Sequence, residues 1–216
     1  MTAVSPAESG VAYYEANAEA FRATVEGRAP VGEARWLADK LSPASLVVDA
    51  GCGIGVDAAW MAGQGLRVYA YDASLKMAWL TSKRLEKIQA PLAPIVRCHR
   101  HDQLRLTEPA AGVLASASLL FLPEQDLRLA MRALAAALAP GGWLVASFKR
   151  GSAPRPQPDG RVYFDRMPSD LQALAKMAGL RGVEVWETDD LLGRSQPWVT
   201  FVLQKEGQQP EQLAHG

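Results

Sequence analysis

Residues 46–55, LVVDAGCGIG, constrain the fold of this chain more than any other stretch. A short β-branched run ends in an acid, and glycine then occupies positions 51, 53 and 55. Glycine costs conformational entropy and adds no side chain to a core, so this density of glycine indicates a turn where the backbone closely approaches something else. A helical pattern follows in residues 56–65. A strand, a glycine turn and a helix in this order predict a ligand site at the start of that helix.

The rest of the chain alternates between strand-like and helix-like segments. Strands are expected at 46–50, 66–72, 92–98, 112–117 and 143–149, with helices at 56–65, 74–88 and 126–142, the last closed by Pro140-Gly141-Gly142. Two final strands, 183–188 and 198–204, have no helix between them and predict an antiparallel edge. The pattern predicts an α/β fold in one domain, with a mostly parallel sheet and helices on both faces.

Local sequence patterns divide the chain into an N-terminal cap, a main domain and a tail. Residues 1–44 carry two helical stripes, at 11–26 and 31–41, and are expected to form an N-terminal helical cap. Residues 45–205 are expected to be the main ligand-binding domain. Within it, residues 151–167 begin with a proline- and glycine-rich run that predicts a lid loop. The polar residues 206–216 predict a flexible tail.

Charge and cysteine content narrow the function. Lys plus Arg and Asp plus Glu both number 23, so the chain lacks the basic field that binding to nucleic acid usually needs. No apolar run is long enough for a membrane helix, and the N-terminus has no signal-peptide pattern. The two cysteines form no C-x-x-C pair, and no metal site is predicted. We therefore expect a cytoplasmic protein, monomeric or homodimeric, that acts on a small molecule without binding nucleic acid or membrane.

The acids beside the glycine turn indicate the charge of its ligand. Asp49 precedes the first glycine by two residues, and it would repel a pyrophosphate but attract a cation. The glycine spacing also differs from the G-x-G-x-x-G of dinucleotide-binding dehydrogenases. Asp72 ends the next strand, where a carboxylate can accept hydrogen bonds from ribose hydroxyls. The ligand should therefore carry a ribose and a positive charge but no phosphate, as S-adenosylmethionine (SAM) does.

Four segments together resemble the class I SAM-dependent methyltransferases: VVDAGCGIG, VYAYD, HRHDQL and ALAPGGWLVAS, covering about residues 45–150. The resemblance implies a Rossmann-like seven-stranded sheet in the order 3-2-1-4-5-7-6, with SAM as cofactor and S-adenosylhomocysteine (SAH) as product. YYEANAEAF and SFKRG further resemble a bacterial small-molecule subgroup that includes tellurite-resistance-type enzymes. The chain departs from that subgroup at Ala111 and Phe121, where its members often carry an acid and a histidine, and Phe121 predicts an apolar substrate face.

The resemblance assigns roles to residues. The residues expected to bind the cofactor are Asp49, Gly51, Cys52, Gly53, Gly55, Asp72, Ala73, His101, Asp102, Gln103 and Ser118. Those expected near the substrate are Tyr13, Tyr14, Phe121, Lys149, Arg150 and Arg161. Transfer of a methyl group from a sulfonium is an in-line displacement, so positioning and desolvation lower much of the barrier and a base is needed only for an acceptor that must lose a proton. The catalytic residue stays unassigned, with His101 and Tyr14 as candidates.

The predicted activity is methyl transfer to O, N or S of a small metabolite. Two alternatives stay open: a detoxifying enzyme that methylates a thiol or a metalloid, and a catalytically silent protein of the same fold that serves a partner. The intact Asp49, Asp72 and glycines argue against the silent protein. After the fourth strand the chain reads SASLLFLP and lacks the Pro-Pro-aromatic signature of amide and adenine N-methylation, which disfavours methylation of nucleic-acid bases.

Overall fold

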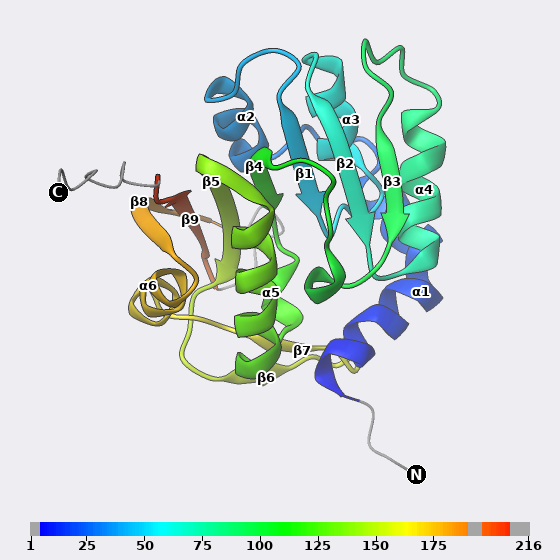
Figure 1. The fold of residues 1–216 in the computed structure, drawn as a ribbon. Helices are drawn as coiled ribbons and strands as arrows, with labels where there is room; N and C mark the ends of the chain where they lie inside the picture. Colours follow the sequence, from blue (N-terminus) through cyan, green and yellow to red (C-terminus); the bar gives the residue numbers. More distant parts are fainter. Residues whose placement is uncertain (1–4, 190–195, 208–216) are drawn as a thin grey trace, which may run out of the picture.

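Seven strands of the computed structural model, which describes residues 5–189 and 196–207, form one sheet in the order β3-β2-β1-β4-β5-β9-β8 (Figure 1). The strands are β1 (Leu46–Ala50), β2 (Arg67–Asp72), β3 (Ile95–Cys98), β4 (Ala110–Ala115), β5 (Leu138–Lys149), β8 (Leu180–Thr188) and β9 (Trp198–Lys205). β1 to β5 pair in parallel, whereas β9 is antiparallel to both β5 and β8. The predicted order and the predicted antiparallel edge are confirmed.

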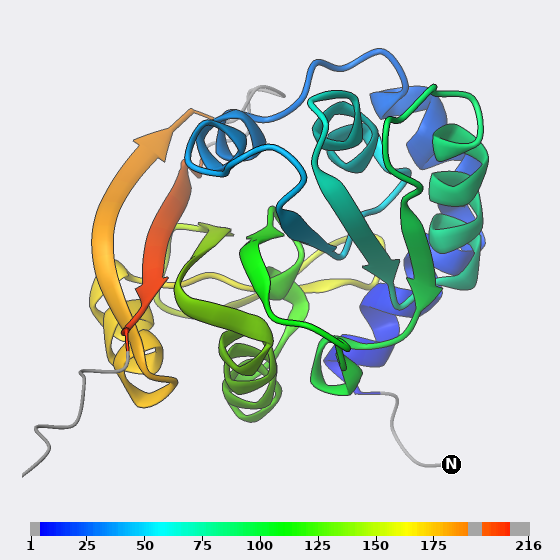
Figure 2. The ribbon, with the colours of Figure 1, turned by 45° about the horizontal axis from the view of Figure 1, so that its top comes forward.

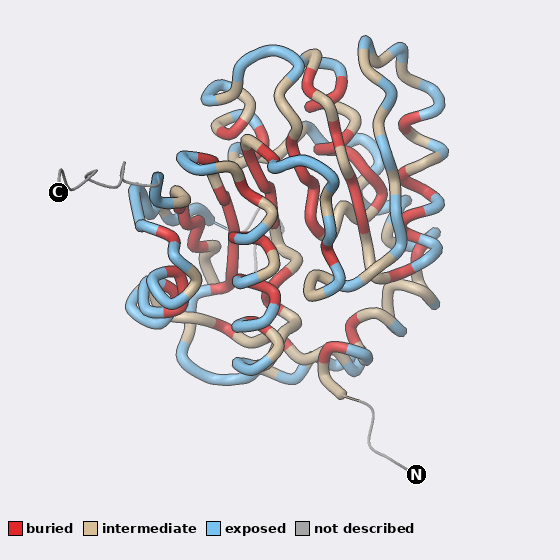
Figure 3. Tube along the Cα trace, viewed as in Figure 1, coloured by how far each residue is buried: buried red, intermediate tan, exposed pale blue. Residues whose placement is uncertain are grey.

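Helices cover both faces of the sheet, as Figure 2 shows. α2 (Gly32–Asp39), α3 (Val56–Gly63) and α4 (Leu75–Leu85) pack on one face, and α5 (Glu124–Ala137) and α6 (Pro168–Met177) pack on the other. β1 shows why both faces need cover. Val47 is buried in the core beneath α2 and α3, and Val48 is buried in the core beneath α5 and α6. Figure 3 shows that most of this strand is buried. No helix in the described ranges is both long and apolar enough to cross a bilayer.

The boundary between α5 and β5 differs from the prediction. The helix ends at Ala137, and β5 begins at Leu138, so Pro140-Gly141-Gly142 lies inside the strand. Leu138 pairs with Ala110, and the register then shifts before Gly112 pairs with Trp143. Gly141 has a φ of +77°, in the left-handed region that glycine enters readily. The Pro-Gly-Gly run therefore forms an irregularity within a strand and does not terminate a helix.

The predicted lid, residues 151–167, contains a two-stranded ribbon of its own. β6 (Pro154–Pro156) and β7 (Val162–Phe164) pair antiparallel, with Arg155 opposite Tyr163. Arg155 also holds the buried carboxylate of Asp165 at 2.7 Å. The predicted lid loop therefore contains short paired strands, and its role as a lid stays a prediction. Most of the predicted tail, residues 208–216, and the first four residues of the chain lie outside the described residues.

α1 (Pro6–Val25) begins at Pro6, earlier than its hydrophobic stripe indicated, because Ser5 and Glu8 form a capping box. The helix is kinked at Asn17, whose backbone is not helical and whose side-chain amide donates to the carbonyl of Tyr13. The arrowheads of β1 and β2 in Figure 1 point toward α1 and the β6–β7 ribbon. Both elements therefore lie at the carboxyl edge of the sheet, where ligands of parallel α/β sheets bind.

Asp57 fastens the segment between α1 and α2 to the helix that follows the glycine turn. It lies in the first turn of α3 and is buried. Its carboxylate accepts hydrogen bonds from Arg28 Nη2 at 2.5 Å and from the backbone N–H of Val31 at 2.9 Å. The side chain therefore serves as a tertiary tie.

Asp57→Ala should lower the free energy of unfolding by about 2 kcal/mol, because it removes a buried acceptor and leaves both Arg28 and the backbone N–H of Val31 without their partner. Glu108→Ala removes a comparable two-contact pair with Arg67 on the exposed surface and should leave stability almost unchanged. Urea unfolding of both variants measures the difference. Equal effects would contradict the tertiary role of Asp57.

Candidate cofactor and acceptor site

The glycine turn has the strained backbone that its sequence predicts. Gly51, Gly53 and Gly55 have φ values of +79°, +55° and +76°, all in the left-handed region. A Cβ on Gly51 would lie 2.4 Å from Cβ of Ser118, which no side chain can tolerate, and 3.6 Å from the ring of His101. The turn therefore needs glycine both for its conformation and for its contact with the segments that follow β3 and β4.

The N–H groups of the turn are largely used by the protein itself. Those of Gly51 and Cys52 donate to the carbonyl of Tyr71 at 2.8 and 2.9 Å, and that of Gly53 donates to Asp72 Oδ2 at 3.0 Å. At the start of α3, the backbone of Ala58 bonds to the carboxylate of Asp49. A carboxylate thus already occupies the helix N-terminus, the position that a pyrophosphate takes in dinucleotide-binding folds.

Asp49 is buried, with 4% of its surface exposed, and its Oδ2 atom has no hydrogen-bond partner among the described residues. Burial raises the pKa of Asp49 well above its usual value, and the negative charge of Asp57 adds to this. Ser118 Oγ, on the other side of the turn, is likewise buried and without a partner among the described residues. Because buried polar atoms are normally hydrogen-bonded, these two atoms fit a polar, positively charged ligand group at the turn.

Asp72 lies at the carboxyl end of β2 and faces the turn. Its Oδ2 accepts from Gly53, and its Oδ1 accepts from the N–H of Ser74 at 2.9 Å. Each oxygen keeps a further lone pair for a ligand hydroxyl. Burial raises the pKa of Asp72 to about 6. The predicted position next to a ribose is therefore consistent with the geometry.

The remaining predicted cofactor residues surround the same edge. His101, Asp102 and Gln103 form the short helix η1 (His101–Gln103) after β3, and Ala73 joins Asp72 to the start of α4. A hydrogen bond of 2.8 Å joins His101 Nδ1 to Tyr71 Oη, and burial lowers the pKa of His101 to about 4. The ring is therefore neutral at pH 7 and lies against Gly51, on the cofactor side.

The sulfur of Cys52 is not activated. It lies 3.3 Å from Thr81 Oγ1, and burial raises the pKa of its thiol well above the usual value. Thr81 Oγ1 also donates to the carbonyl of Gly53 at 2.8 Å. Cys52 and Thr81 therefore support the turn, and neither offers a nucleophile.

Five aromatic rings form a cluster beside the turn: Tyr13, Tyr14, Phe21, Phe121 and Tyr163. Tyr14 makes edge contacts with Tyr13, Phe21 and Phe121 at centroid distances of 5.3, 5.2 and 5.6 Å. Phe121 contacts Tyr163 at 5.5 Å, and Phe21 lies 3.7 Å from the position of a Cβ on Gly53. The cluster thus extends from the cofactor turn to the β6–β7 ribbon.

The predicted substrate residues divide into two groups. Tyr13, Tyr14 and Phe121 belong to the aromatic cluster, and Arg161 donates to Tyr14 Oη at 2.9 Å. Lys149 instead lies over the ring of Trp198 and donates to the carbonyl of Gln196. Arg150 pairs with Glu187 of β8 on the surface. The structure therefore brings together Tyr13, Tyr14, Phe121 and Arg161. The side chains of Lys149 and Arg150 instead contact residues of β9 and β8.

Three contributors to this site were not singled out as site residues, although two of them, Glu15 and Phe21, lie in the segment YYEANAEAF that carries the resemblance. Phe21 is part of an ordinary hydrophobic stripe, and Tyr163 follows a run without periodicity. Glu15 of α1 accepts from Ser74 Oγ at 2.6 Å and from the N–H of Lys76 at 3.1 Å, so it caps α4 beside Asp72. Its place in YYEANAEAF, on a predicted capping helix, is the signal that could have indicated it.

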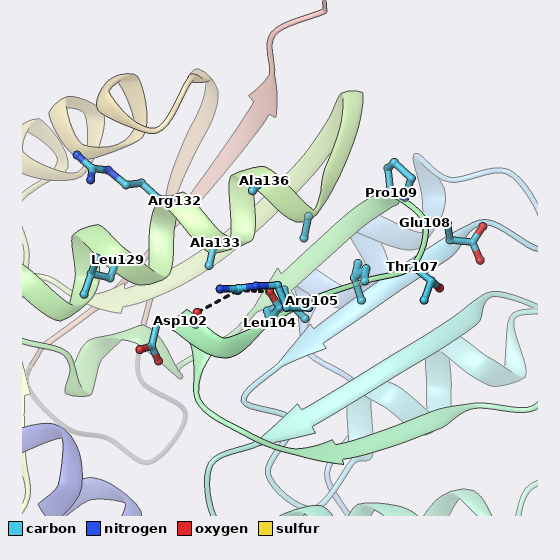
Figure 4. Close-up of a pocket in the computed structure, with 12 residues that line it drawn as sticks. Asp102, Leu104, Arg105, Thr107, Glu108, Pro109, Leu129, Arg132, Ala133 and Ala136 are labelled. Atoms are coloured by element: carbon cyan, nitrogen blue, oxygen red, sulfur yellow. Dashed lines mark hydrogen bonds between the residues drawn. The ribbon is translucent and has the colours of Figure 1, made fainter.

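A separate groove of about 500 Å³ lies between α5 and residues 102–109. Figure 4 shows Ala133 and Ala136 on its α5 side and Arg105 across from them, with Arg105 held by backbone carbonyls. Asp102, at its rim, also belongs to the predicted cofactor residues. The groove is an apolar-walled surface depression outside the glycine turn.

Solved structures share this fold across nearly the whole chain. Magnesium protoporphyrin IX methyltransferase from Synechocystis PCC 6803, with bound SAM, is 18% identical with a TM-score of 0.77, covering 95% of this chain and 100% of that one. A toxoflavin-precursor N1-methyltransferase from Burkholderia thailandensis, with its substrate 1,6-didemethyltoxoflavin and SAH bound, is 19% identical with a TM-score of 0.76, covering 92% and 88%. A TehB-like SAM-dependent methyltransferase from Corynebacterium glutamicum is 19% identical with a TM-score of 0.69, covering 90% and 99%.

The sheet order and the acid-flanked glycine turn define the class I methyltransferase fold. Residues 47–142 match the model of a family described as methyltransferase domain. The methyltransferase fold predicted from the motifs is confirmed, and the match of residues 47–142 agrees with the predicted class, whereas the tellurite-resistance subgroup stays a prediction. A sequence search of curated proteins found no match.

Gly51→Ala should lower the free energy of unfolding by about 2 kcal/mol and abolish SAH binding, because the added methyl meets Ser118 at an unfavourable φ. Gly65→Ala is the matched control, with a φ of +84° but no atom within 4 Å of the added methyl. It should cost about 1 kcal/mol and leave SAH binding intact. Thermal melts and calorimetric titration separate the two. Loss of binding in both variants would contradict a specific role for the turn.

The raised pKa of Asp72 predicts a pH-dependent difference between the parent and Asp72→Asn. In the folded state Asp72 holds its proton up to a pH of about 6, so its contribution to stability is largest below pH 4 and is lost as the pH rises to 6. The free energy of unfolding of the parent, minus that of the variant, should fall by about 2 kcal/mol over this interval. Denaturant titrations at pH 4, 5, 6 and 7 measure it. A flat difference would show that Asp72 is not desolvated.

Proposed function

We propose that this protein transfers a methyl group from SAM to O, N or S of a small molecule and releases SAH. The observation that carries the proposal is the buried Asp49 carboxylate, whose Oδ2 has no partner in the described part of the chain. A ligand ammonium group at the turn would supply that partner. Asp72 adds negative charge nearby, whereas that of Asp57 is paired with Arg28, and the remaining charge favours a cationic ligand over a phosphorylated one.

The cofactor groups are assigned to residues as follows. The methionine end of SAM lies at Asp49, the glycine turn and Ser118. Asp72 accepts hydrogen bonds from the ribose, and Asp102 and Gln103 lie at the adenine. When bound, SAM supplies an electrophilic methyl group on a sulfonium, and the surrounding protein holds it in place and excludes water.

The aromatic cluster is assigned to the acceptor. Tyr14 cannot act as a base near neutral pH, because burial raises the pKa of its phenol far above the usual value. His101 is neutral and faces Gly51 and Tyr71, so it is placed for the cofactor. The acceptor atom is therefore nucleophilic without help from either candidate. The neighbours act on magnesium protoporphyrin IX and on 1,6-didemethyltoxoflavin, which supports a small-molecule acceptor here.

The same site bears on the two alternatives, a thiol or metalloid methyltransferase and a catalytically silent protein. The TehB-like neighbour keeps methylation of a thiol or a metalloid open, and the aromatic walls of this site favour an organic acceptor instead. A silent partner protein would not need an unpaired buried carboxylate at the turn. We also propose that the protein binds no nucleic acid, on the grounds of its balanced charge, and that it acts in the cytoplasm, as its sequence pattern predicts.

Asp49→Asn should weaken SAH binding at least tenfold, because it removes the negative charge that would meet the ligand ammonium group. Asp39→Asn, at an exposed position at the end of α2, is the control and should leave the affinity unchanged. Isothermal titration with SAH, with a thermal melt of each variant to confirm folding, makes the comparison. An unchanged affinity in a folded Asp49→Asn variant would contradict the assignment.

A further inference from the structure

Arg161 places a guanidinium among the aromatic rings of the acceptor site. It lies between β6 and β7, and only 14% of its side chain is exposed. Its guanidinium carbon is 4.0 Å from the ring centroid of Tyr13, 5.4 Å from that of Tyr163 and 5.5 Å from that of Tyr14. One N–H donates to Tyr14 Oη at 2.9 Å. A largely buried positive charge therefore lies beside the aromatic cluster.

The carboxylate that neutralises this charge is replaceable. Asp159 holds Arg161 through contacts of 2.6 to 3.2 Å, but it belongs to the same short turn, and a third of its side chain is exposed. In contrast, Arg155 is held by Asp165, whose side chain is only 3% exposed. Because Asp159 is local in sequence and partly exposed, a ligand carboxylate can take its place without leaving the guanidinium of Arg161 unpaired. Arg161 is thus the arginine of the ribbon that can change partners.

The rings beside Arg161 are suited to a flat ligand. Phe121 stands between Tyr14 and Tyr163 in edge-to-face contacts. Gly10 on α1 has no side chain, and the ring of Phe121 lies 3.3 Å from the position of its missing Cβ. Aromatic side chains interact favourably with the face or the edge of a planar ring. Phe21 extends the same cluster to Gly53, so a ring held there lies next to the cofactor turn.

From these contacts we propose that the methyl acceptor is a planar aromatic anion. Its ring packs among Tyr14, Phe121 and Tyr163, and its carboxylate, or an equivalent anionic group, binds Arg161 in place of Asp159. This inference rests on the proposed function, since it concerns the acceptor half of the same site.

Charge decides between an anionic and a cationic acceptor. Arg161 already supplies the cation that the tyrosine faces attract, so a second cation would meet repulsion in a site largely removed from water. A carboxylate instead can form two parallel hydrogen bonds with the guanidinium. Arg161 thus favours an anionic ligand, and the rings of Tyr14, Phe121 and Tyr163 favour a flat one.

The test uses 2-naphthoate and its neutral amide, 2-naphthamide, as probes of SAH-saturated protein in calorimetric titrations. We expect the parent to bind 2-naphthoate at least tenfold more tightly than the amide. Arg161→Gln should remove this preference, whereas Asp159→Asn should increase the affinity for 2-naphthoate severalfold, because it removes the competing carboxylate. Arg128→Gln, a surface variant on α5 whose arginine pairs with Glu124, should behave as the parent does.

Two results would overturn the inference. One is equal affinity of the parent for both probes, and the other is an unchanged preference in a folded Arg161→Gln variant. Asp159→Asn keeps Arg161 in place, so it tests the idea even if Arg161→Gln fails to fold. If SAH binds and the parent shows no preference, the aromatic-anion assignment fails while the proposed function stands. If SAH itself does not bind, the proposed function fails as well.

Discussion

A carboxylate buried beneath the first turn of α3 determines what this site can bind. Asp49 fills the helix N-terminus that a phosphate would otherwise occupy, and one of its oxygens has no partner in the described chain. Asp57 and Asp72 stand close to it, so negative charge accumulates where the strands end. The three glycines bring the backbone near these groups without side chains in the way. A ligand with a positive charge and free hydroxyls satisfies this arrangement, and a pyrophosphate does not.

The other half of the site depends on two elements from distant parts of the chain. α1 lies across the carboxyl edge and is fastened beside Asp72 through the contact of Glu15 with Ser74. The β6–β7 ribbon meets α1 through Arg161 and Tyr14. The proposed acceptor side therefore presents aromatic rings and one guanidinium, whereas the glycine turn is flanked by backbone and carboxylates.

The sequence predicted the cofactor half better than the acceptor half, and the reason is physical. The turn at Gly51 has a local signal, because its glycines and its acid all lie in one short stretch of sequence. The order of the sheet followed from the alternation of strands and helices together with the resemblance. The ribbon was missed because its pairing of Arg155 with Tyr163 has no periodic signal, and the role of Phe21 arises only from tertiary contact. The end of α5 was misplaced because a Pro-Gly-Gly run suits an irregular strand as well as a helix stop.

A crystal structure of the protein with SAH tests the central claim most directly. We expect the amino group of SAH within hydrogen-bond distance of the Asp49 carboxylate and its ribose hydroxyls on Asp72. SAH bound away from the turn, for example in the groove between α5 and residues 102–109, would contradict the claim that the buried carboxylate selects the ligand.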